Sequence, residues 1–197
     1  VMNRIFEIAQ QAPSNCNVLP WKVYVASGEL KERLRRKMVE ATAGGVMPNP
    51  DYPYRGDFQD EYRIRQVECA VALYSKMGIS RGDKEGRMRA VLRNFEFFDA
   101  PHIAFLGMNP AFGTTVAIDV GMFAQSLMLT MVAFGLHSCP MGTMRNYPDM
   151  VREAFQIEDG TKILFGISFG YEDSDVVANE TRTTRDDISA NIVFRSN

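Results

Sequence analysis

The chain has 197 residues, of which 46% are hydrophobic and 23% charged, a composition typical of a globular protein with one sizeable core. The net charge is −2 without any basic block, so nothing indicates a nucleic-acid-binding protein. Three scattered cysteines without CxxC spacing argue against a disulfide framework and fit a reducing, cytoplasmic compartment. Two histidines far apart in sequence do not support a zinc site, and we expect no metal.

The first part of the chain predicts a helix, a strand and a second helix. Apolar positions of residues 2–12 fall on one helical face, and Pro13 ends that helix. Residues 13–20 are rich in turn formers. Residues 21–26 are rich in β-formers, and residues 30–43 form a charged amphipathic helix.

Segment 44–57 is rich in glycine and proline and predicts a long loop. Loops of this length inside a compact domain are often functional lids. A surface insertion explains the composition equally well, and the sequence leaves both interpretations open.

The rest of the chain predicts four helices and three strands. The helices are expected at residues 58–77, 84–98, 117–134 and 147–155, and the strands at 102–108, 162–171 and 192–194. Residues 137–145 are expected to form a loop. Strands alternate irregularly with long helices and no linker divides the chain. We therefore expect one domain over residues 1–197 with a three-layer α+β or mixed α/β architecture.

The longest apolar stretch, residues 117–136, is interpreted as a buried core helix. It contains Asp119, Gln125, Ser126 and Thr130. A membrane span of about 20 residues rarely carries an acid and an amide, so we expect no membrane partner. Asp119 is favourably placed near the positive end of this helix.

No convincing nucleophile–base set or carboxylate pair is present, so an enzyme of this sequence would rely on a cofactor. Three loops carry suitable donors. In the first, Ser14, Asn15 and Asn17 offer hydroxyl and amide groups that can bond a ring edge or a phosphate. Capping of the neighbouring helix and strand ends is the simpler explanation for this loop alone.

The second and third loops have similar alternatives. Gly142 ends the loop 135–142 and permits close backbone approach, although a plain helix cap and turn would also need it. The third follows the glycine-containing strand 162–171. There Arg182 and Arg185 suit a phosphate, or form a solvated basic spot in an acidic tail.

The order of several short motifs changes this balance. APSxxNxxPW occupies residues 12–21, FFxAP residues 97–101, and DxGxxxQxxxL residues 119–129, followed by GLxxCPxG at 135–142. A strand ending in GxxxGY and a late RTxR at 182–185 complete the set. Together they resemble the nitroreductase family over essentially the whole chain.

The resemblance implies an FMN enzyme with a nitroreductase-like three-layer α+β fold, a central mixed sheet flanked by helices, and an intertwined homodimer with the flavin at its interface. It implies that helix 117–134 forms the dimer and that residues 192–194 join the partner's sheet. It also implies the cofactor-binding residues, which are Pro13, Ser14, Asn15, Asn17, Pro140, Met141, Gly142, Arg182 and Arg185. The Gly142 amide is expected near the flavin N5, and the two arginines at the phosphate.

Two departures from the family pattern matter. Family members usually start about 25 residues earlier, a figure that is approximate because connection lengths vary. Their additional segment is arginine-rich and binds FMN. We therefore expect the natural chain to begin upstream of Val1. Leu19 stands where glutamine is common, which removes a polar contact near the ring. Arg93 and Asn94 are further candidates for ring contacts, with an uncertain register.

The resemblance further implies ping-pong transfer of two electrons from NADH or NADPH to a nitroaromatic, quinone or similar acceptor. No protein side chain is expected to be catalytic. Alternatives with the same fold are reductive dehalogenation, oxidative flavin breakdown and a non-catalytic flavin-binding module. A helical scaffold without a cofactor is a fourth interpretation. The sequence does not name the natural substrate or choose between NADH and NADPH.

Overall fold

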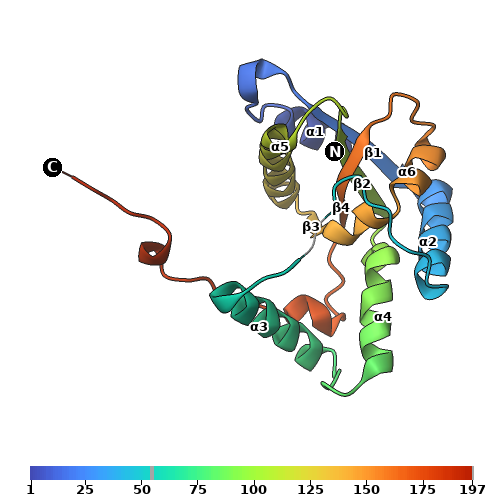
Figure 1. The fold of residues 1–197 in the computed structure, drawn as a ribbon, viewed down its shortest axis with the longest axis vertical. Helices are drawn as coiled ribbons and strands as arrows, with labels where there is room; N and C mark the ends of the chain where they lie inside the picture. The colour runs from blue at the N-terminus through green and yellow to red at the C-terminus, as the bar shows by residue number, and fades with distance from the viewer. Residues whose placement is uncertain (54–55, 197) are drawn as a thin grey trace. The chain divides into compact units, whose positions relative to one another are not determined.

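The computed structural model describes residues 1–53 and 56–196. The chain forms two compact units, and Figure 1 shows their elements. The larger unit spans Val1–Tyr54 and Arg87–Glu172, and the smaller spans Arg55–Gly86 and Asp173–Asn197.

The larger unit is built around a four-stranded sheet with the order β1-β2-β4-β3. Its strands are β1 (Trp21–Ser27), β2 (His102–Met108), β3 (His137–Met141) and β4 (Lys162–Gly170). The α+β class is confirmed. A mixed sheet was expected, whereas all three pairings among the described strands are antiparallel.

Strand β3 occupies a segment where a loop was expected, so the prediction of a loop over 137–145 was wrong in its first half. The strand has only five residues and contains Pro140, which masks the alternation typical of strands. Proline is tolerated here because β3 lies at the edge of the sheet, where an N–H is not needed for pairing. The remaining residues form a 3₁₀-helix, η3 (Gly142–Asn146).

Helices cover both faces of the sheet in the larger unit (Figure 1). Along β2, Ala104 and Leu106 point into the core beneath α1 and α5, whereas Ile103 and Phe105 point into the core beneath α2 and α6. This alternation confirms the expected three layers. The helices are α1 (Met2–Ala9), α2 (Gly28–Ala43), α5 (Thr114–Ala133) and α6 (Pro148–Phe155).

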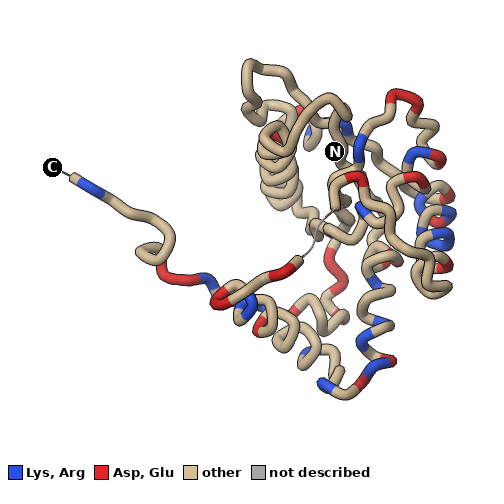
Figure 2. The backbone as a smooth tube through the Cα atoms, viewed as in Figure 1, with Lys and Arg blue, Asp and Glu red and all other residues tan. Residues whose placement is uncertain are grey.

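Helix α2 carries most of its charge in ion pairs. Figure 2 shows acidic and basic residues close together along this helix. Arg35 pairs with Glu32 at 2.7 Å, and the largely buried Lys31 pairs with the same carboxylate at 2.7 Å. These hydrogen bonds lower the pKa of Glu32 to about 2. The charged side chains of α2 are therefore largely paired with one another, while Leu34 and Met38 on the same helix are buried in the core.

Helix α5 is the most apolar helix of the larger unit, and by length and composition alone it could cross a membrane. One of its faces packs on the sheet, where the ring of Phe123 stacks on Trp21 with centroids 4.8 Å apart. Asp119 is buried on the same helix. We therefore interpret α5 as the core helix that the sequence predicted.

Helix α4 (Lys84–Phe95) starts in the smaller unit and continues into the larger one. It is followed by η2 (Phe97–Asp99), whose three residues all have positive φ angles. Helix α4 is shorter than the predicted 84–98 because it ends at Phe95, before the left-handed turn at the start of the FFxAP motif.

The smaller unit contains α3 (Asp60–Lys76), η4 (Val177–Glu180) and η5 (Ile188–Ala190). Lys76 pairs with Glu180 at 2.8 Å, which ties the C-terminal segment to α3. Residues 192–194 form no strand within the described chain, and their side chains are exposed. The predicted last strand is therefore not an element of the single chain, because a strand needs an edge to pair with.

The segment after α2 is hydrogen-bonded to the region around η3 within the larger unit. The Asn49 N–H donates to the Asn146 carbonyl at 2.9 Å, and the Tyr147 hydroxyl donates to the Val46 carbonyl at 3.1 Å. The predicted loop 44–57 includes residues 54–55, which lie outside the described residues.

Candidate cofactor site

The loop between α1 and β1 is closed at its base by two side chains. The Trp21 indole N–H donates to Gln10 Oε1 at 2.7 Å. Inside the loop, the Leu19 N–H donates to Ser14 Oγ at 3.0 Å. The motif residues 12–21 thus form a closed loop whose ends are fixed by the packing of α1 and β1.

The backbone of this loop is preformed in an uncommon conformation. Cys16, Asn17 and Leu19 have φ angles of 48°, 56° and 45°. Left-handed backbone at residues other than glycine costs about 1–3 kcal/mol each and persists where the surroundings enforce it. Such strain is typical of functional loops.

Two of the predicted donors in this loop remain available. Ser14 Oγ accepts the Leu19 N–H, so its own proton is free to be donated. For the Asn17 side chain, no hydrogen-bond partner is found within residues 1–53 and 56–196. The Asn15 N–H is already used, because it donates to Asp119 Oδ2 at 3.0 Å.

The second predicted loop becomes the end of β3 and the start of η3. Pro140 is exposed, whereas the Met141 side chain is buried in the core on the α2 side of the sheet. Gly142 has open space where a Cβ would stand. As the first residue of a helix it has an N–H without a partner inside that helix.

Asn94 lies beside this loop. The Thr143 hydroxyl donates to Asn94 Oδ1 at 3.4 Å, next to Gly142. The sequence suggested Asn94 as a ring contact, but its alignment with the family motif was not fixed. It did not suggest Thr143, because the contact between Thr143 and Asn94 joins residues 49 apart. The sequence feature that could have indicated Thr143 is its position as a polar residue directly after the GLxxCPxG motif.

Arg93 is engaged elsewhere. It pairs with Glu96 at 2.8 Å and with Asp99 at 2.7 Å. The hydrogen bond that Arg93 donates to Asp99 lowers the pKa of the Asp99 carboxyl and raises the pKa of Arg93. Arg93 therefore stabilises the turn after α4, and its guanidinium is already committed to carboxylates.

The two groups of donors are far apart within one chain. The first loop leads into β1 and Gly142 follows β3, and these strands are the opposite edges of the sheet. Three strand spacings separate the edges by about 14 Å. The structure thus assembles Ser14 with Asn17, and Pro140 with Gly142, but one subunit does not bring the two groups together.

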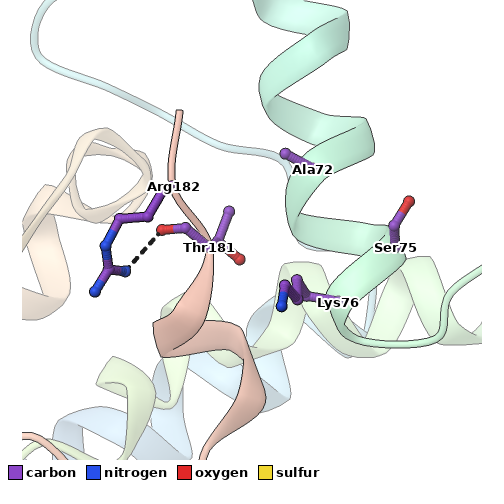
Figure 3. Close-up of a pocket in the computed structure, with 5 residues that line it drawn as sticks. All are labelled: Ala72, Ser75, Lys76, Thr181 and Arg182. Atoms are coloured by element: carbon purple, nitrogen blue, oxygen red, sulfur yellow. Dashed lines mark hydrogen bonds between the residues drawn. The ribbon is translucent and has the colours of Figure 1, made fainter. Parts of the chain in front are cut away.

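The predicted phosphate ligands belong to the smaller unit. Arg182 lines a pocket of about 300 Å³ together with Ala72, Ser75, Lys76 and Thr181 (Figure 3). Its guanidinium turns back and donates to the Thr181 carbonyl at 3.0 Å and to the Asn179 carbonyl at 2.6 Å. Arg185 bonds only to its own neighbours, Thr183 and Thr184, in the described structure.

The donors of the larger unit fit a flat heteroaromatic ring better than they fit a metal. The first two loops offer a hydroxyl, an amide and a main-chain N–H, which suit the polar edge of a ring. In the smaller unit, the two arginines by themselves suit a phosphate. Among the described residues, no group of three or more His, Cys, Asp or Glu side chains is placed to hold a metal ion.

Comparisons with known proteins agree with this description. The family model described as "Nitroreductase family" matches residues 1–171. The chain is 37% identical over 194 residues to nitroreductase NfnB of Mycolicibacterium smegmatis, covering 98% of this chain and 82% of the relative. It is 30% identical over 190 residues to a 4-nitrobenzoate reductase of Pseudomonas putida, covering 94% and 82%.

The fold agrees with a solved structure as well. The crystal structure of the FMN-dependent nitroreductase NfnB from Mycobacterium smegmatis in complex with NADPH matches with a TM-score of 0.94 and 37% identity. The match covers 99% of this chain and 87% of that one.

Proposed function

Because the chain belongs to the nitroreductase family, we propose that it is an FMN-dependent nitroreductase that passes two electrons from NADPH to a nitroaromatic acceptor. The observation that carries the proposal is the match over nearly the whole chain to relatives named for nitro reduction. The solved relative with NADPH bound favours NADPH over NADH. Bound FMN supplies the redox chemistry.

The protein's own part is to bind and orient. Ser14 and Asn17 keep free polar groups in a rigid loop, and Gly142 has open space where a Cβ would stand. We assign these groups to the flavin, with Pro13, Asn15, Pro140 and Met141 shaping the same site. Arg182 and Arg185 are assigned to the FMN phosphate, for which both must exchange their present backbone partners.

A homodimer explains how donors at opposite edges of one sheet act on one flavin. The Asn15 loop is tied to Asp119 near the start of α5, whereas β3 follows the end of α5. These two points are about 20 Å apart along the helix. Antiparallel pairing of α5 with its copy places the start of one helix beside the end of the other. Each flavin would then lie between one subunit's Ser14–Asn17 loop and the partner's Gly142 loop.

The solvent-facing side of α5 has the symmetry that such pairing needs. Ile118, Leu129 and Val132 are 63%, 62% and 63% exposed on a helix whose other side is core. Around the exposed Gln125, Ile118 and Val132 are each seven residues away, and Gly121 and Leu129 are each four away. A two-fold axis at Gln125 would set Leu129 over the bare backbone of Gly121 in the partner subunit. An interface around a two-fold axis must be self-complementary in this way.

The proposed dimer also explains the exposed apolar side chains of the C-terminal tail. Val193 and Phe194 are 76% and 83% exposed, and pairing with the partner's sheet would bury them. We further propose that both units belong to a single FMN-binding domain, and that the protein is soluble and cytoplasmic. Its relatives reported above are named for nitro reduction, which disfavours dehalogenation, flavin breakdown and a non-catalytic module.

Turnover tests the proposed function. Purified protein loaded with FMN is mixed with NADPH and 4-nitrobenzoate or nitrobenzene, and absorbance at the NADPH band is followed. We expect consumption of NADPH that requires both FMN and the nitroarene, and slower consumption with NADH. Loaded protein that consumes NADPH at the same rate without any nitroarene would contradict the assignment of the acceptor.

A further inference from the structure

Asp119 is a buried carboxylate that the flavin site does not use directly. It is 6% exposed and is the sixth residue of α5. The first turn of α5 carries no acidic residue, and the helix-end effect fades beyond that turn. A buried carboxylate is costly unless it is hydrogen-bonded, so its position calls for a specific partner.

That partner is the backbone of the Ser14–Leu19 loop. The Asn15 N–H donates to Asp119 Oδ2 at 3.0 Å across 104 residues of sequence. The contact therefore joins the loop to a helix that is itself fixed on the sheet by Phe123 and Leu127.

The contact with Asp119 joins the middle of the loop to another element, which its other hydrogen bonds do not do. The Gln10–Trp21 bond closes the base where α1 ends and β1 begins, and the Ser14–Leu19 bond joins two residues of the loop. The Asn17 and Val18 N–H groups donate to the Ser14 and Asn15 carbonyls, which also belong to the loop. The left-handed residues Cys16 and Asn17 directly follow Asn15, so the Asp119 contact lies where the strained backbone begins.

We propose that Asp119 is a positioning residue for the cofactor site: it holds the Asn15 amide so that the Ser14 hydroxyl and the Asn17 amide stay directed at the flavin. This proposal rests on the proposed function. It also links the loop to α5, so the helix proposed to form the dimer and the loop proposed to grip the cofactor are one rigid assembly. The Asn15 N–H is consequently not a cofactor donor, and Asn15 contributes only its side chain.

Three variants on α5 test the role. Asp119→Ala removes the acceptor, and Asp119→Asn keeps an oxygen that can accept the Asn15 N–H. Thr130→Val is the matched control, because the Thr130 hydroxyl is buried and bonds only to the Ser126 carbonyl of the same helix. If Asp119→Ala does not fold, Asp119→Ser, which is too short to reach the amide, replaces it.

Two readouts are needed, and one is independent of FMN. Apoprotein affinity for FMN is measured by quenching of flavin fluorescence, and hydrogen exchange of the peptide containing Asn15 is measured in the apoprotein. We expect Asp119→Ala to weaken FMN binding by about tenfold or more, the loss of one hydrogen bond to a charged group. Exchange at the Asn15 peptide should become faster, while Asp119→Asn and Thr130→Val stay within about threefold of the wild type.

The outcomes separate the two proposals. Asp119→Ala protein that binds FMN as tightly as the wild type would overturn the positioning role and leave the proposed function intact. Equal losses in Asp119→Ala, Asp119→Asn and Thr130→Val would show a general structural role and would also overturn it. Wild-type protein that binds no FMN would contradict the proposed function, while hydrogen exchange would still report on the contact between Asp119 and Asn15.

Discussion

Arg152 donates to the buried carboxylate of Asp51 at 2.7 Å, joining the segment after α2 to helix α6. The same carboxylate accepts the Ile163 N–H at 2.8 Å and pairs with Lys162 at 3.3 Å. Burial raises the pKa of Asp51, but the hydrogen bonds from Arg152 and Ile163 outweigh it and the net shift is downward. The Asp51 carboxylate thus joins the segment after α2 to both helix α6 and strand β4.

Removal of Asp51 should destabilise the fold strongly. Asp51→Ala leaves the Arg152 guanidinium and the Ile163 N–H without their shared acceptor, and we expect a loss of about 3 kcal/mol in the free energy of unfolding. Asp149→Ala is the matched control, because the 73% exposed Asp149 pairs with the same arginine. It should cost less than about 1 kcal/mol. Urea unfolding measures both, and equal losses would refute the central role of Asp51.

The contribution of Asp51 should depend on pH in a defined direction. Its pKa in the folded protein lies below the ordinary value of 3.8, so its stabilisation is present above that value and is lost as the pH falls through the folded pKa. The difference in unfolding free energy between wild type and Asp51→Ala should stay constant from neutral pH to about pH 5 and shrink at pH 3. Unfolding curves at these three pH values check it. A difference that grows on acidification would have the wrong sign.

A charge on the exposed face of α5 should prevent association. Leu129→Glu places a carboxylate against the proposed two-fold contact, and we expect a monomer with little FMN, since the proposed site is shared by two subunits. Met47→Glu is the control, because Met47 is 82% exposed and lies away from α5 in the chain. Sedimentation and the visible spectrum report both properties. A Leu129→Glu dimer that retains FMN would rule out this interface.

Arg182 and Arg185 should strengthen the binding of FMN but not that of riboflavin, which lacks the phosphate. Arg182→Ala or Arg185→Ala removes charged hydrogen bonds to the phosphate, so FMN binding should weaken about 10- to 100-fold while riboflavin binding stays unchanged. Arg81→Ala, another arginine of the smaller unit, should change neither. Fluorescence titrations with the two flavins measure this difference. Equal weakening for FMN and riboflavin would argue against a phosphate contact.

Much of the fold followed from local patterns. The strand 102–108 was predicted with the bounds that the structure has, because its apolar residues are continuous and bounded by proline and asparagine. The core helix was predicted within three residues at either end. Strand β3 was missed because Pro140 hides it, whereas a strand was predicted at 192–194 and none forms in the described chain.

The candidate site was predictable in part only. Ser14, Asn17 and Gly142 stand out as residues of unusual loops. The role of Asp119 did not, because its contact with Asn15 joins two elements 104 residues apart and depends on how α5 packs. The separation of the donors onto opposite sheet edges likewise follows from strand order, which local sequence does not encode.

The most direct test of the account is an anaerobic titration of the purified, FMN-loaded protein with NADPH, followed at the visible flavin band. We expect complete bleaching at one NADPH per FMN, and recovery of the band when a nitroarene is added after the nicotinamide is spent. A band that NADPH leaves unchanged, or that no nitroarene restores, would contradict it.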